Sequence, residues 1–109
     1  MLQTDYKFGE VHNLAAQVVS AEDRVHFNSI FTNDNGGVVM LAFKAGQQLE
    51  THTATAEVMV NVLEGSIEFT MLEKTHKINA GEFLLMGADV PHSVKALADS
   101  KLMLVKIKA

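Results

Sequence analysis

The stretch GQQLETHTATAEVMVNVLEG, residues 46–65, decides the fold together with GEFLLMGADVPH, residues 81–92. Each stretch begins with a glycine and carries one histidine, His52 in the first and His92 in the second. Strand-like segments lie between the histidines, and the Glu-Gly pair at 64–65 marks a turn midway. His52 and His92 are forty positions apart in the sequence and can meet only if the sheet folds back on itself. We therefore expect a β-fold that brings His52 and His92 face to face across the mouth of a barrel.

Short strands account for the chain after residue 24. Apolar segments alternate with turn signals every eight to twelve residues or so, as is typical of β-sandwiches and barrels. No helix-length amphipathic stretch separates the segments, so parallel βαβ units are not expected. The predicted strands are Val25–Thr32, Gly37–Ala45, Leu49–Thr53, Val58–Glu64, Ser66–Met71, Lys74–Ile78, Phe83–Met86, His92–Ala96 and Lys101–Lys108.

The 109 residues are enough for one domain and too few for two. We expect a single domain over 1–109, with an N-terminal arm at 1–24 and the barrel at 25–108. Within the arm, Leu14–Val19 reads either as a helical turn or as an edge strand, and Ser20–Asp23 as the cap of a short helix.

Two predicted strand segments, Val38–Lys44 and Val58–Leu63, are apolar on both faces. Both faces of these strands are therefore expected to be covered. One face can line the barrel interior. No helix is available for the other, which leaves a second copy of the chain or the N-terminal arm as its cover. We expect a homodimer joined through these doubly apolar strands, with the N-terminal arm contributing, because a lone barrel would expose a large apolar patch. The candidate outer-face residues are Met59 and Leu63, or Val39, Leu41 and Phe43.

Composition excludes several classes of site and partner. Nine basic against 13 acidic residues give a net charge of -4, which argues against nucleic acid or an anionic membrane as a partner. There is no cysteine, so disulfides, thiolate metal sites and a cysteine nucleophile are excluded. The N-terminus shows no secretory signal pattern, and we expect a cytoplasmic protein.

The glycine–histidine spacings resemble the two-part motif of the cupins, small jelly-roll barrels that often hold a metal. The first motif of that family runs glycine, His-x-His, glutamate, glycine. Gly46, His52 and Gly65 keep its spacing, but Ala54 stands where the second histidine would be and Val58 where the glutamate would be. Glu57 is one residue off, and a one-residue shift on a strand points a side chain to the opposite face.

The second motif of the family runs glycine, five residues, Pro-x-Gly, two residues, histidine. Gly81 and His92 keep this spacing, whereas Gly87 takes the proline position and Asp89 the second glycine position. The Pro91-His92 pair is similar to that of many small cupins. The resemblance covers roughly residues 36–108 and implies an all-β, cupin-type jelly-roll barrel of two antiparallel sheets. It points to a subgroup of mostly unassigned function.

In the family, three histidines and a glutamate hold a divalent metal, and here two histidines remain. A catalytic zinc normally keeps three protein ligands. We therefore expect the pair His52 and His92 to be either partly occupied by a divalent metal, nickel or zinc, or free of metal.

Two functions stay open. One is a binding barrel for a small organic molecule with a polar or acidic group, which His52 and His92 orient. The other is a metal-dependent enzyme of oxygenase, isomerase or decarboxylase type that uses the same pair, or uses it as general acid and base. Beside the two histidines, the expected pocket residues are Met40, Ala54, Val58, Val60 and Val94.

Overall fold

A computed structural model describes all 109 residues. Nine strands follow one short 3-10 helix, and their ends differ from the predicted ones by at most two residues. The structure contains no helix that could span a membrane. The elements are η1 (Ala15–Gln17), β1 (His26–Asn33), β2 (Gly36–Phe43), β3 (Gln48–His52), β4 (Ala56–Glu64), β5 (Ser66–Met71), β6 (Lys74–Asn79), β7 (Phe83–Met86), β8 (His92–Ala96) and β9 (Ser100–Lys108).

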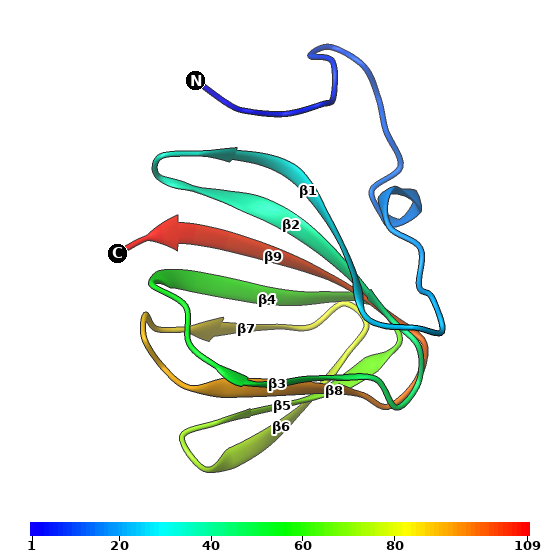
Figure 1. Cartoon of the computed structure of the whole chain (residues 1–109), viewed down its shortest axis with the longest axis vertical. Helices are drawn as coiled ribbons and strands as arrows, with labels where there is room; N and C mark the ends of the chain where they lie inside the picture. The colour runs from blue at the N-terminus through cyan, green and yellow to red at the C-terminus, as the bar shows by residue number, and fades with distance from the viewer.

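The strands form two sheets, and every pairing is antiparallel. One sheet has the order β1-β2-β9-β4-β7 and the other the order β3-β8-β5-β6. Figure 1 shows the five-stranded sheet above the four-stranded one, with β9 in the middle of the upper layer. The prediction of an all-β fold of two antiparallel sheets is confirmed.

The main core lies between the sheets and follows the two-residue period of the strands. In β4, Val58, Val60 and Val62 are buried, and the residues between them are only partly buried. Leu41 and Phe43 of β2 belong to the same core. The alternative that placed Val39, Leu41 and Phe43 on the outer face is therefore wrong. Both faces of β2 are apolar, so its sequence alone could not choose between them.

The N-terminal arm covers part of the outer face of the five-stranded sheet. Val18 packs there with Met40 and Ala42 of β2, in a second buried cluster. Figure 1 shows the arm beyond β1, above it and to its right, before the chain enters this strand. The amide of Asn28 anchors it by donating to the carbonyl of Gln17 at 2.6 Å. The arm therefore covers part of the outer face of β2, which is one of the two covers expected from the sequence.

Within the arm, the helical-turn reading of Leu14–Val19 is the closer one, because residues 15–17 form η1. The predicted helix after Ser20–Asp23 is wrong, since only bends precede β1 there. The turn at Gly65 is as predicted. Gly65 has a φ of +80°, and a side chain there would collide with the carbonyl oxygen of Asp99. Glycine is therefore required for β4 to turn into β5.

Candidate functional site

His92 stands at the start of β8, directly after Pro91, and is 6 % exposed. Its ring stacks on Phe69 of the neighbouring strand β5, with 5.5 Å between ring centroids and an interplanar angle of 15°. Proline cannot donate to a sheet ladder, which explains why the strand begins after it. Stacking and burial fix the His92 ring at the inner wall of the barrel.

His52 ends β3 and is the cross-strand partner of His92. The two ring centroids are 4.2 Å apart, with the rings tilted by 56°. The structure therefore brings the two predicted histidines together. They are neighbours on adjacent strands of one sheet, however, and do not face each other across the mouth. The predicted opposition is wrong because β3 pairs directly with β8, which the spacing could not reveal.

Backbone carbonyl groups fix the orientation of both imidazoles. Nδ1 of His52 lies 2.8 Å from the carbonyl oxygen of Glu50, and Nδ1 of His92 lies 2.9 Å from that of Val90. A carbonyl oxygen only accepts, so each ring carries a proton on Nδ1. Each neutral ring then has its lone pair on Nε2. A hydrogen bond from one ring nitrogen to a carbonyl group also orients many histidines that bind metals.

The surroundings of His92 favour its neutral form. Burial is the largest cause that lowers its pKa from 6.5, and the charges of His52 and Lys106 lower it further. The hydrogen bond with Val90 acts in the opposite direction and does not outweigh them. The ring is therefore an acceptor at neutral pH, able to receive a hydrogen bond or to coordinate a cation through Nε2.

Both imidazoles open onto a partly enclosed cavity of about 140 Å³ between the sheets. Four of the five other predicted pocket residues, Ala54, Val58, Val60 and Val94, line it. Met40 does not, and its assignment to the pocket is wrong because it lies on the opposite face of β2, under the arm. The remaining lining residues are Leu41, Leu49, Thr53, Phe69, Met86, Leu102, Leu104 and Lys106.

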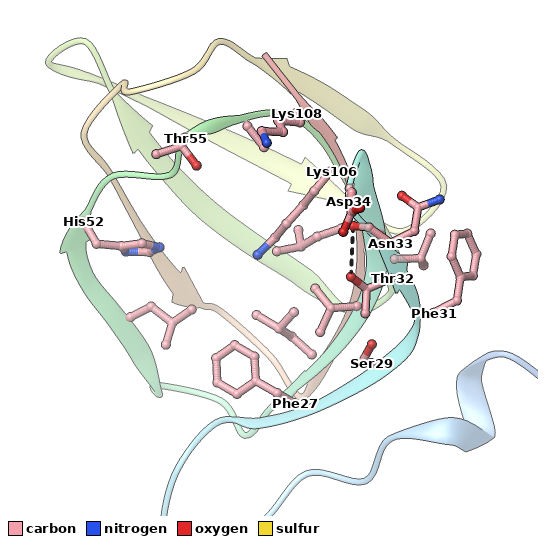
Figure 2. Close-up of a pocket in the computed structure, with 18 of the residues that line it drawn as sticks. Phe27, Ser29, Phe31, Thr32, Asn33, Asp34, His52, Thr55, Lys106 and Lys108 are labelled. Carbon is pink, nitrogen blue, oxygen red and sulfur yellow. Dashed lines mark hydrogen bonds between the residues drawn. The ribbon is translucent and has the colours of Figure 1, made fainter. Parts of the chain in front are cut away.

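A wider mouth of about 750 Å³ adjoins the enclosed cavity. His52 and Lys106 line both spaces, so they stand where the mouth meets the cavity. Figure 2 shows Lys106 reaching from β9 toward the middle of the pocket, with His52 pointing inward from the opposite wall. Two acidic residues, Asp34 and Glu50, lie on the mouth. No acidic side chain lines the inner cavity.

Sequence reasoning missed Lys106. A signal was present, because Leu102 and Leu104 face the barrel interior and Lys106 continues the same alternation along β9. The residue was read only as part of a strand. Its position matters because Lys106 is the cross-strand partner of Val58, the residue in the glutamate position of the motif.

The residues present do not fit a resident metal ion of the four-ligand type. No group of three or more histidine, cysteine or acidic side chains that could hold a metal occurs in the structure. Glu57 is exposed and lines a depression on the outer surface, while Val58 faces the cavity. Lys106 brings a positive charge to the wall where the motif would have a negative one. Two imidazole nitrogen atoms remain as donors, below the usual three of a catalytic zinc.

Asp89, in the second glycine position of the motif, keeps the turn that a glycine would make. Its φ is +62°, in the left-handed region that aspartate tolerates better than most residues. Its backbone N–H donates to the carbonyl of Ala54 at 2.7 Å. This hydrogen bond joins the loop before His92 to the loop after His52. An aspartate in the glycine position therefore still allows the backbone turn that holds the two loops together.

Comparison with known proteins gives the family of the chain. The model of the cupin domain matches residues 39–108. No curated protein matches the sequence.

Solved structures share the fold over nearly the whole chain. A conserved protein of unknown function from Streptococcus pyogenes has 23 % identity and a TM-score of 0.88, over 97 % of this chain and 93 % of the other. A cupin superfamily protein from Desulfitobacterium hafniense has 14 % identity and a TM-score of 0.88, over 100 % and 99 %. An RmlC-like cupin from Desulfovibrio desulfuricans has 29 % identity and a TM-score of 0.80, over 90 % and 95 %. Because the matched residues span β3 to β9 and most of β2, the chain belongs to the cupin domain family.

Proposed function

We propose that the barrel binds a small organic molecule in the cavity beside His52 and His92. The observation that carries the proposal is the pair of Nε2 lone pairs on adjacent strands, at the edge of a mostly apolar cavity. Ligand pockets are commonly apolar with a few polar groups that orient the ligand. Here the two imidazoles are such groups, and the valine, leucine and phenylalanine side chains form the apolar walls.

A thermal-shift screen of metabolites, with and without nickel, zinc, iron and manganese, tests this proposal. A ligand at about a hundred times its Kd stabilises the folded state by about 2.7 kcal/mol. In a domain of this size that corresponds to a rise in Tm of more than about 10 °C. The shift should be lost in His92→Ala and kept in His12→Ala, since His12 is exposed in the arm. If no compound in the screen raises the Tm of the wild type in a way that is lost in His92→Ala, the proposal is refuted.

A metal-dependent small-molecule enzyme is the second candidate. The observation that favours it is the same pair of Nε2 atoms on neighbouring rings, whose centroids are 4.2 Å apart. Against it stands the absence of a third donor. Stabilisation by a metabolite only when metal is present, followed by turnover of that metabolite, would favour the enzyme over the binding barrel.

We also infer a homodimer through the outer face of β4, β7 and β9, beyond the arm. Met59, Leu85, Val105 and Ile107 line a depression there. Leu85 is 68 % and Ile107 is 58 % exposed in the single chain. Exposed apolar patches of this kind mark interaction surfaces, and a second copy of the same face would bury these side chains.

A further inference from the structure

The ammonium group of Lys106 lacks an acidic partner. The three ion pairs of the structure join Asp23 to Arg24 and to His26, and Lys44 to Asp99. Lys106 is half-buried and reaches the boundary between the mouth and the enclosed cavity. A charge in such surroundings loses hydration, and a group of opposite sign compensates for that loss.

The cavity beyond Lys106 has a volume that suits a small apolar group. Its volume of about 140 Å³ is close to that of an apolar protein cavity, about 150 Å³, that holds one benzene molecule. Valine, leucine, methionine and phenylalanine side chains make up most of its walls. No carboxylate lines it, so an anionic ligand would meet no repulsion from the inner walls.

The pairing of Lys106 with Val58 across β9 and β4 also favours an anion. In the cupin motif this part of the barrel carries a glutamate, whose negative charge suits a cation. Here an uncharged valine takes that position, and its cross-strand partner is a lysine. The charge at this corner is therefore positive, which favours an anion over a divalent cation.

Resting on the proposed function, we propose that the pocket takes a small organic monoanion. Its acidic group pairs with Lys106 where the mouth meets the cavity. Its apolar part, no larger than about a benzene ring, enters the space between the sheets. Small aromatic or branched aliphatic monocarboxylates have this chemistry.

Benzoate and its neutral analogue benzyl alcohol are suitable probes, because they share the ring and differ in charge. Both are titrated into the full chain in metal-free buffer at low salt, with binding followed by calorimetry or by NMR. A charge-assisted hydrogen bond should make benzoate bind roughly tenfold to a hundredfold more tightly than benzyl alcohol. Added salt should weaken benzoate binding only partly, because Lys106 is half-buried.

Three variants assign that preference to Lys106. Lys106→Met keeps most of the length of the side chain and removes its charge, so the preference for benzoate should disappear. Lys106→Arg keeps the charge and should retain the preference. Lys108→Met removes a charge from the exposed rim of the same strand and should leave the preference nearly unchanged. Thermal melts of each variant confirm that the barrel is folded.

Equal binding of the two probes by the wild type, or a preference that survives in Lys106→Met, would overturn the proposal. If both probes bind equally and His92→Ala abolishes both, the proposed function stands and the anionic class is wrong. If neither probe binds, this ligand class is also wrong. The proposed function itself then fails only if the wider metabolite screen yields no ligand that depends on His92.

Discussion

Replacing Val58 by glutamate measures how strongly Lys106 projects its charge into the barrel. Val58 is 4 % exposed and lies opposite Lys106 in the pairing of β4 with β9. A buried carboxylate without a partner costs several kcal/mol. The attraction between this carboxylate and an ammonium group about 4 Å from it would offset about 4 kcal/mol of that cost, at an effective dielectric constant of about 20. We expect Val58→Glu to lower the free energy of unfolding by only about 1–3 kcal/mol.

Val60→Glu is the matched control. Val60 lies on the same face of the same strand and is 1 % exposed, but its cross-strand neighbours are Leu84 and Leu104. With no cation opposite, the carboxylate should cost about 3–5 kcal/mol or more. That is a large part of the total stability of a domain of this size. Urea unfolding followed by far-UV circular dichroism suits a chain without tryptophan.

A double-mutant cycle then isolates the pair. Lys106→Met is made in the wild type and in the Val58→Glu variant, and the coupling energy between the two positions should be about 1.5–3 kcal/mol. A coupling below about 0.5 kcal/mol, or equal losses from the two glutamate substitutions, would show that Lys106 does not act inside the barrel.

Four further predictions concern His92, the turn, the metal and the dimer. Because the pKa of His92 is lowered, the folded state binds fewer protons than the unfolded state below pH 6.5. The stability that the neutral ring contributes is therefore complete above pH 6.5 and falls as the pH drops below it. Urea melts of the wild type and of His92→Gln should show this dependence only in the wild type. Asp89→Gly should change stability by less than about 1 kcal/mol, whereas Asp89→Val should cost about 1–2 kcal/mol because of its left-handed φ; equal melting temperatures would contradict this. Added nickel or zinc should bind weakly and below one equivalent, and elemental analysis after dialysis should find less in both His52→Ala and His92→Ala; tight stoichiometric binding would mean that other ligands take part. Light scattering at micromolar concentration should give a dimer for the wild type and a monomer for Leu85→Glu, and a monomeric wild type would rule out the interface.

The sequence predicted the strands well because their signals are local. Turn residues and the two-residue period define each segment without reference to its neighbours. The meeting of His52 with His92 also followed from paired spacings. Their arrangement as cross-strand neighbours did not, because it depends on β3 pairing with β8, a contact between segments forty residues apart.

The errors occurred where one face of a strand had to be chosen over the other. Met40 was placed in the pocket because both faces of β2 are apolar, and only the position of the arm decides which face is outside. Lys106 was missed for the opposite reason. A lysine near the end of a strand is usually in solvent, and its inward position becomes evident only when the alternation begun by Leu102 is followed to the end of β9.

The place of β9 has a consequence for how the barrel assembles during synthesis. Among the nine strands it is the last to leave the ribosome, yet it lies between β2 and β4, which are more than a dozen residues apart in the chain. Until β9 emerges, β2 and β4 present unpaired edges to each other and to other chains. Long-range pairings of this kind form slowly, and exposed edges favour aggregation. Chains stalled before Ser100 should therefore depend on chaperones, and the cavity beside Lys106 can form only after the final strand has inserted.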